Sequence, residues 1–387
     1  MMNDDVHIGY CTNVHAGTSF RQIVENLEKY SVPVKQAVSP NAPIGIGLWF
    51  SSDAVAEMTD TGTVTEFKNW LSEQGLNPFT FNAFPFSDFH QPVVKHKVYE
   101  PTWAEETRLE YTLAIARLQA ALLSENQFGT ISTLPLGWPT KMSDSFLEKA
   151  AANLLECANG LKELHDETGQ RIFLSIEPEP GCILDTNDDL IAFFEEWLLA
   201  KCDGNEEVVR DYLGVCHDVC HSAVMFEPQD EALQNYRSAG IHVGKFQISS
   251  AIEVNFESQD IQGRQMLISE LSSFAEDRYL HQTVVKTEDG ACQFFEDLPL
   301  AIERFQADPQ GTWRIHFHVP IFADQVSNLS TTRNDIEDCL QSFVSNKLPV
   351  HYEVETYAWT VLPDSHQPES LEMGISKELE YFLSMVS

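Results

Sequence analysis

The chain has 387 residues, of which 43% are hydrophobic, so it can bury a large core, and barrels of this size with insertions commonly form one domain. Its 24 basic and 59 acidic residues give a formal charge of -35, which opposes binding to nucleic-acid phosphates and to anionic membranes. No stretch approaches the roughly 20 apolar residues of a membrane span, and no signal peptide opens the chain. Eight scattered cysteines without C-x-x-C spacing indicate reduced thiols. We therefore expect a cytoplasmic protein.

Short apolar runs recur along the chain and are separated by segments with helical periodicity. Near-continuous apolar runs are typical of parallel strands that helices cover on one side. Eight such runs are what a (β/α)8 TIM barrel requires. In chain order they are residues 6–11, 44–50, 79–84, 129–136, 172–177, 213–218, 243–249 and 350–357.

The segments between these runs predict helices. In residues 104–123, apolar side chains recur at spacings of three and four, and the segment opens with acidic residues, which the helix dipole favours. The alternation of strand and helix therefore predicts an α/β fold. Comparable segments are residues 20–29, 62–74, 143–168, 187–200 and 331–345.

One region does not fit a minimal barrel. Residues 252–348 lie between the seventh and eighth runs and contain a helix-like piece at 261–277 and a further strand-like piece at 313–322. No Gly/Ser-rich linker or low-complexity tract separates this region from the rest. We expect an elaboration over the barrel mouth, within a single domain that spans residues 1–387.

Acidic and histidine side chains stand at the ends of the later runs. Glu177 ends its run just before Pro178, which removes a backbone donor and helps to end the strand. Asp218 and His221 form a D-x-x-H motif after the sixth run. In parallel barrels the carboxyl ends of all strands meet at one mouth, so these side chains are expected to converge there.

Two more pairs repeat this placement. His316 and His318 alternate in H-F-H, so a strand would send both imidazoles to one side. Glu353 and Glu355 alternate in the last run, where Glu355 lies nearer the mouth. Carboxylates and imidazoles gathered from separate strands can hold a divalent metal ion. Cys216 and Cys220 are better explained as packed interior thiols.

Loops from the first half of the chain would complete the pocket. The candidates are polar or aromatic residues that follow the early runs, and the long loop after the third run is typical of a lid. Lys95 could contact an anionic or hydroxylated substrate, and Trp138 could stack on a sugar face. These candidates are Tyr10, Asn13, His15, Asn82, His90, Lys95 and Trp138.

Taken together, Glu177, D-x-x-H, H-x-H and Glu355 resemble the xylose isomerase-like barrel superfamily, which includes sugar epimerases and the endonuclease IV type of DNA repair enzyme. Over nearly its whole length the chain also resembles the EboE family of metabolite traffic proteins. That second resemblance is carried by H-I-G-Y-C-T-N-V-H-A-G at 7–17, by H-D-V-C-H-S-A-V-M-F-E at 217–227 and by similar blocks. The others are residues 47–50, 89–103, 131–138, 244–251 and 355–363.

The epimerase resemblance implies one divalent ion, Mn, Mg, Zn or Co, held by Glu177, Asp218, His318 and Glu355, with His221 touching the substrate. Strand seven departs from the pattern, because Gln247 stands where a histidine ligand is expected. Either Gln247 replaces that ligand, or His316 or His318 supplies it. Glu177 and Glu355 would then exchange a proton with a metal-bound hydroxy-carbonyl substrate from opposite sides.

Three functions from different classes remain open. The first is a metal-dependent isomerase or epimerase of a sugar, polyol or cyclitol. The second is a non-catalytic protein that binds a small polar metabolite in an EboE-like export pathway, with room for pathway partners and for an oligomer. The third is an endonuclease IV-like phosphodiesterase, which the acidic charge disfavours because no nucleic-acid partner is expected.

Overall fold

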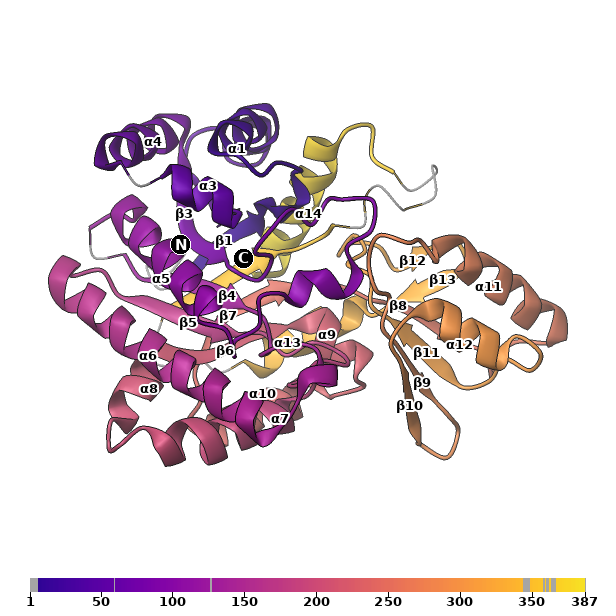
Figure 1. Ribbon diagram of the computed structural model, residues 1–387. Coiled ribbons are helices and arrows are strands. Elements are labelled where there is room, and N and C mark those ends of the chain that lie inside the picture. The colour runs from indigo at the N-terminus through magenta and orange to yellow at the C-terminus, as the bar shows by residue number, and fades with distance from the viewer. Residues whose placement is uncertain are drawn as a thin grey trace.

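The computed structural model describes residues 6–58, 60–125, 127–343, 349–357, 359, 362 and 367–386. Eight parallel strands close into a barrel in the order β1-β14-β7-β6-β5-β4-β3-β2 (Figure 1). The predicted (β/α)8 barrel is therefore confirmed. The strands are β1 Val6–Cys11, β2 Ile44–Trp49, β3 Leu76–Asn82, β4 Gly129–Thr133, β5 Ile172–Ile176, β6 Leu213–Asp218, β7 Val243–Ile248 and β14 Val350–Val354.

Helices surround the barrel, and α6 shows how local sequence signals start and stop them. In α6 the Ser143 hydroxyl accepts from the Phe146 amide as an N-cap, and Gly169 ends the helix at a φ of 74°, a conformation that glycine adopts without steric cost. The helix predicted at 20–29 instead continues through a π-helical turn to Val38, and the one predicted at 187–200 changes to a π-helix after Phe193. The helices between the first seven strands are α1 Phe20–Asn26, α2 Val32–Val38, α3 Ser52–Glu57, α4 Thr61–Gln74, α5 Glu106–Leu122, α6 Asp144–Thr168, α7 Asn187–Phe193, α8 Glu206–Tyr212, α9 Val219–Val224 and α10 Gln229–Ser238.

The barrel interior contains a buried ion pair beneath the mouth. Lys245 on β7 lies 2.6 Å from the Glu353 carboxylate on β14, and both side chains are fully buried. Gly47 on β2 makes this possible, because a Cβ atom there would lie 1.2 Å from Glu353 Oε1. A buried charge needs a partner of this kind, because burying an unpaired charge in the interior costs roughly several kcal/mol.

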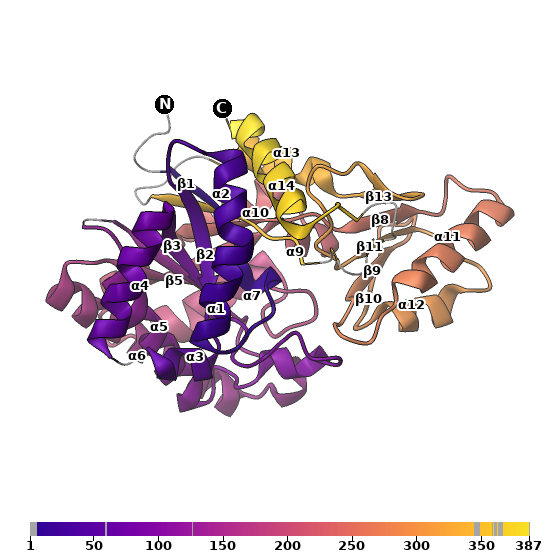
Figure 2. The same cartoon turned by 90° about the horizontal axis from the view of Figure 1, so that it is seen from above.

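A second sheet stands between β7 and β14 in the chain and forms a lobe beside the barrel (Figures 1 and 2). Its core is separate from that of the barrel, with Ile252, Trp313 and Ile315 packed against two helices. The elements are β8 Ile252–Asn255, α11 Ile261–Phe274, β9 Thr283–Lys286, β10 Cys292–Phe295, α12 Leu298–Phe305, β11 Thr312–Ile315, β12 Gln325–Val326 and β13 Leu329–Thr331. We call residues 249–332 the insertion.

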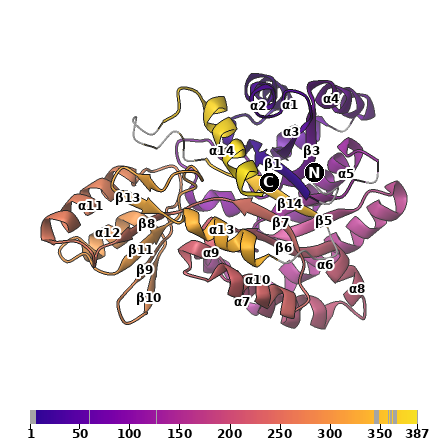
Figure 3. The same cartoon turned by 180° about the vertical axis from the view of Figure 1, so that it is seen from behind.

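The chain returns from the insertion to the barrel wall. Helix α13 (Arg333–Ser342) packs against α9 and α10, and α14 (Leu371–Val386) packs against α2 (Figures 2 and 3). Thus α13 covers the barrel between β7 and β14, as the helices of the other repeats do. Among the described residues, no helix is both long and apolar enough to cross a membrane.

Candidate metal centre and pocket

Three carboxylates meet at the mouth because their strands end there. Glu177 directly follows β5, and its amide donates to the Thr133 carbonyl of β4. Asp218 is the last residue of β6 and also caps α9, where one of its oxygens accepts from the His221 amide at 2.9 Å. Glu355 follows β14. One carboxylate oxygen from each of Glu177, Asp218 and Glu355 lies within 4.8 Å of the other two.

Two of the imidazoles come from the insertion. His316 and His318 follow β11, and the strand ends at Ile315 because the segment that carries them crosses from the second sheet to the barrel mouth. His318 Nδ1 donates to the Glu355 carbonyl at 3.0 Å. The other ring nitrogen, Nε2, then carries the lone pair and lies 3.7 Å from Asp218 Oδ2. The insertion thus adds a candidate nitrogen ligand to carboxylates that the barrel supplies.

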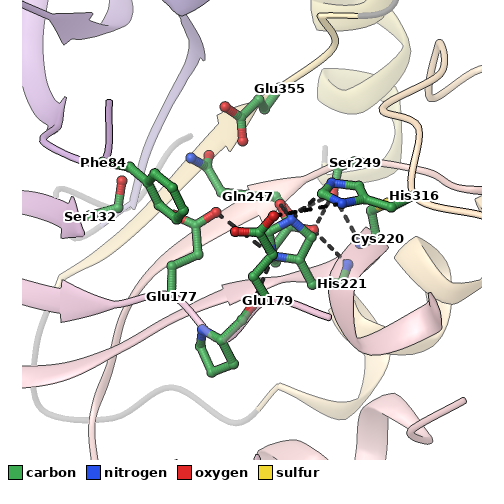
Figure 4. Close-up of polar contacts among 12 residues, drawn as sticks. Phe84, Ser132, Glu177, Glu179, Cys220, His221, Gln247, Ser249, His316 and Glu355 are labelled. Atoms are coloured by element: carbon green, nitrogen blue, oxygen red, sulfur yellow. Dashed lines mark hydrogen bonds and ion pairs between the residues drawn. The ribbon is translucent and has the colours of Figure 1, made fainter. Parts of the chain in front are cut away.

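Asp218, His221 and His318 also form a group of metal-ligand geometry, as do Glu179, His221 and His316. Figure 4 shows His221 and His316 beside Glu179, with Glu177 and Glu355 on the other side of the site. His221 Nδ1 lies 2.8 Å from the Pro178 carbonyl, so Nδ1 carries the hydrogen and Nε2 faces His316 Nε2 at 3.2 Å.

The residues at the mouth fit a divalent metal ion. Glu177 Oε2, Asp218 Oδ2 and His318 Nε2 are all buried and have no hydrogen-bond partner. Buried polar atoms are nearly always satisfied, and unpartnered ones that converge on one point indicate a missing ligand. Carboxylate oxygen together with imidazole nitrogen suits Mn, Mg, Zn or Co, and the donor set does not select among these metals.

The electrostatics point the same way. Burial, followed by the charges of Glu355 and Asp218, raises the pKa of Glu177 well above its usual range. Burial, followed by the charges of Asp218 and Glu353, raises the pKa of Glu355 to about 8. Burial lowers the pKa of His318 to about 4, which leaves its ring neutral and able to act as a ligand near pH 7. Adjacent buried carboxylates repel one another, so a cation between them would stabilise the ionised forms.

Gln247 occupies the position on β7 where its register partners are Asp218 on β6 and Glu353 on β14. Its side chain is fully buried, and neither its amide oxygen nor its amide nitrogen has a hydrogen-bond partner. His316 and His318 line the cavity, whereas Gln247 is not among the described lining residues. Of the two histidines, only His318 belongs to a group that contains Asp218.

A hydrogen-bond network behind the site joins three distant segments. Glu179 Oε1 accepts from the Tyr99 hydroxyl at 2.7 Å and from Gln282 Nε2 at 2.9 Å. The Gln282 amide oxygen in turn accepts from His316 Nδ1 at 2.8 Å. Tyr99 lies in the loop after β3, which we call the lid loop, and Gln282 belongs to the insertion. The network therefore joins the lid loop, the segment after β5 and the insertion.

These side chains surround a cavity of about 100 Å³. Carboxylates and imidazoles make its floor, whereas aromatic and aliphatic side chains from the loop after β3 and from the insertion make much of its wall. This volume equals that of about three water molecules and is smaller than the roughly 300–1,000 Å³ of pockets for drug-sized ligands. The lining residues are Asn13, Asn82, Phe84, Pro85, Phe89, Lys95, Val98, Tyr99, Glu177, Glu179, His221, Tyr279, Leu280, His316, His318, Glu355 and Tyr357.

The candidates from the first half of the chain divide into two groups. Asn13, Asn82 and Lys95 line the cavity, and Asn13 Nδ2 donates to Glu355 Oε1. The others are not among the described lining residues, because aromatic packing holds them behind the wall. His15 stacks on Tyr30, His90 packs on Phe89, Trp138 stacks on Tyr99, and the Tyr10 hydroxyl bonds to Ser31.

Sequence reasoning missed four residues that shape the site. Tyr357 follows Glu355 at the period of two in E-T-Y, so the alternation used for Glu353 and Glu355 could have found it. Ser249, which donates to Asp218 Oδ1 at 2.8 Å, ends its apolar run much as Glu177 does. Tyr99 and Gln282 carry no such signal, because neither ends a barrel strand.

Comparison with known proteins supports the fold. A xylose isomerase-like TIM barrel protein from Mycobacterium smegmatis, solved in complex with magnesium, is 12% identical with a TM-score of 0.54, and the match covers 98% of this chain and 96% of that one. The probable 3-DHS dehydratase AsbF of petrobactin synthesis from Bacillus anthracis is 12% identical with a TM-score of 0.50 and covers 98% of both chains. The fold is that of a xylose isomerase-like TIM barrel. At this identity the likeness extends to the fold alone.

No protein-family model matches the sequence, and no curated protein matches it. The resemblance to the EboE family therefore gains no support from these comparisons and stays a hypothesis about the pathway. A fold does not specify a reaction, so the function has to be inferred from the residues at the barrel mouth.

Proposed function

We propose that the protein is a metal-dependent isomerase or epimerase of a small hydroxy-carbonyl compound such as a sugar, polyol derivative or cyclitol. The observation that carries the proposal is that Glu177, Asp218 and Glu355 form one group of possible ligand atoms and that Asp218 and His318 belong to a second one. Glu177 Oε2, Asp218 Oδ2 and His318 Nε2 are buried and unpartnered. These four residues would hold the metal ion, with Gln247 as a fifth candidate. A bound divalent ion supplies Lewis acidity, which makes a C–H next to a carbonyl easier to ionise.

Two carboxylates are available to move the proton. Glu177 comes from β5 and Glu355 from β14, so the two approach the cavity from different parts of the barrel rim. One would remove the proton from the substrate carbon and the other would return it, which inverts or relocates the stereocentre. Asn13 holds the Glu355 carboxylate by donating to Oε1. Burial raises the pKa of both carboxyls, that of Glu355 to about 8, so a carboxyl here can hold a proton at a higher pH than an exposed glutamate.

His221 would orient the substrate. Its Nδ1–H is held by the Pro178 carbonyl, so Nε2 is the atom that can accept a hydrogen from a substrate hydroxyl. The surrounding aromatic wall excludes water from the reacting carbon, which protects a carbanion-like species from unwanted protonation.

The test is proton exchange with solvent. The metal-supplied protein is incubated in D₂O with a panel of ketoses and cyclitol ketones, and NMR follows the loss of the C–H signal next to the carbonyl. We expect exchange that EDTA abolishes and that Glu177→Gln and Glu355→Gln variants lack. A protein that binds metal but exchanges no proton in any member of a broad panel would contradict an isomerase.

That negative outcome would favour the second candidate, a non-catalytic metabolite-binding protein of an EboE-like export pathway. Its support is the set of EboE-like sequence blocks, including residues 7–17 and 217–227. An endonuclease IV-like phosphodiesterase is disfavoured by the formal charge of -35 and by the small cavity. Titration with a labelled abasic duplex at low salt tests it, since binding would revive this candidate.

A further inference from the structure

One cation lines the cavity apart from the histidines, and it is already paired. Among the described lining residues, Lys95 is the single lysine or arginine. Its Nζ lies 2.6 Å from Asp297 Oδ2 in the insertion. The Lys95 side chain is 29% exposed and the Asp297 side chain 11%, so solvent screens this pair only in part. The positive charge that could attract an anionic substrate is therefore neutralised by an acid from outside the barrel.

The backbone around both partners holds the pair in place. The Val94 and Lys95 amides both donate to the Arg278 carbonyl, at 2.8 and 3.0 Å. Asp297 Oδ1 accepts from the His281 amide at 3.2 Å, which orients the carboxylate toward Lys95. Lys95 itself has a φ of 42°, a left-handed conformation that non-glycine residues seldom adopt without such support. The lid loop and the insertion are thus joined with the two charges face to face.

The other residues that line the cavity disfavour the binding of an anion. Its floor carries the carboxylates of Glu177, Glu179 and Glu355, and a single divalent ion would offset only part of their charge. Its wall is apolar, with Phe84 and Val98 from the lid loop and Leu280 from the insertion. Sites that bind sugar phosphates or sugar acids use free arginine or lysine side chains or helix N-termini. The described lining offers no unpaired side chain of that kind.

We propose that Asp297 is a specificity-determining residue: by neutralising Lys95 it makes the cavity select uncharged hydroxy-carbonyl compounds over sugar phosphates and sugar acids. This inference rests on the proposed function, because it concerns the substrate of the same site. Uncharged substrates present hydroxyls to the polar floor and C–H faces to the aromatic wall. Specificity of this type depends on what disfavours the wrong substrate, here the negative charge of Asp297 and of the carboxylates, as much as on attraction to the right one.

The experiment measures the affinity of inorganic phosphate for the Mg²⁺-supplied protein by isothermal titration calorimetry. In Asp297→Asn the side chain keeps its size and its acceptor for the His281 amide, so the fold is retained while Lys95 loses its counter-charge. We expect phosphate to bind about fivefold more tightly than to the wild type, the effect of roughly one charge pair. The double variant Asp297→Asn with Lys95→Gln should return to the wild-type affinity.

The matched control is Glu296→Gln, which removes the same charge one residue away, where the side chain is 47% exposed and faces His96. Its phosphate affinity should stay at the wild-type value. Equal phosphate affinity in the wild type and Asp297→Asn would overturn the proposal, and so would a gain that persists in the double variant. Because the readout is anion affinity and not turnover, failure of the isomerase assay is distinguishable from failure of this inference.

Discussion

The barrel and the insertion contribute different chemistry to one site. The barrel supplies carboxylates, since Glu177, Asp218 and Glu355 stand at the ends of parallel strands. The insertion supplies two imidazoles, since His316 and His318 follow a strand of the second sheet, and the barrel supplies a third, His221 in α9. Each part has its own hydrophobic core. The comparison teaches that the barrel contributes the carboxylates and His221, and that the docked insertion adds His316 and His318 to the candidate metal site.

The two regions also differ in what they demand of the sequence. A barrel strand places its last residue at the mouth by topology, whatever that residue is. The insertion must instead be held by specific contacts, such as His318 Nδ1 to the Glu355 carbonyl and Gln282 to Glu179. Substitutions of the barrel carboxylates should therefore remove proton-transfer groups and candidate metal ligands. Substitutions in the insertion should remove the candidate ligand His318 or the contacts that hold it in place.

The largest effect is expected from the barrel carboxylates. Glu177→Gln and Glu355→Gln should each lower metal-dependent proton exchange by about 10²–10⁴-fold, because each removes a proton-transfer group and a metal ligand. NMR exchange rates and metal content by mass spectrometry measure this. The exposed Glu206→Gln serves as the control. Full exchange in both barrel variants would refute the proposed roles.

The next largest effect is expected from the two histidines of the insertion, which should differ in how much they contribute to metal affinity. His318 groups with Asp218, whereas the hydrogen bond of His316 runs to Gln282. His318→Ala should therefore weaken Mn²⁺ binding by about 100-fold, and His316→Ala should weaken it by about tenfold or less. Gln247→Ala measures the part that the strand-seven amide contributes. Calorimetric Mn²⁺ titrations of the three variants rank the ligands, and a larger loss in His316→Ala would reverse the assignment.

The pH dependence of stability should distinguish metal-free from metal-loaded protein. Burial raises the pKa of Glu355 from 4.5 to about 8, so in the metal-free protein the folded state keeps a proton that the unfolded state releases. Stability is then lost as pH rises from 4.5 toward 8, by up to about 1.4 kcal/mol per pH unit. Denaturant titrations at pH 5 and pH 8 should show this loss, and added metal should reduce it.

Glu378 provides the control for that measurement. Burial also raises its pKa to about 8, but its carboxylate accepts from Thr356 and from the Ile321 amide instead of facing the metal site. Its share of the pH dependence should persist after metal is added. A metal-loaded Glu378→Gln variant whose stability falls between pH 5 and pH 8 as steeply as that of the metal-free wild type would contradict this explanation.

The smallest effect on proton exchange is expected from the hydrogen-bond network of Glu179, Gln282 and His316. Gln282→Leu keeps the side-chain volume but breaks the link between Glu179 and His316. Proton exchange should fall by about tenfold while the free energy of unfolding changes little beyond the lost hydrogen bonds. A variant with unchanged exchange and unchanged metal affinity would show that the network does not position His316.

The sequence was a good guide wherever local rules and topology coincide. Apolar alternation predicted the eight barrel strands, and strand ends pointed to Glu177, Asp218 and Glu355. The cap at Ser143 and the stop at Gly169 likewise follow from local chemistry. The xylose isomerase-like resemblance agrees with the fold found by comparison, whereas the EboE resemblance rests on the sequence alone.

By itself, then, the sequence determined the barrel and the acidic residues at its mouth, because apolar runs separated by helical segments are typical of parallel strands, and the carboxyl ends of parallel barrel strands share one mouth. Only the tertiary structure grouped His318 with Asp218, paired Lys95 with Asp297, and kept His15, His90 and Trp138 out of the described cavity lining. Those outcomes depend on how the insertion docks, a matter of contacts between residues far apart in the chain.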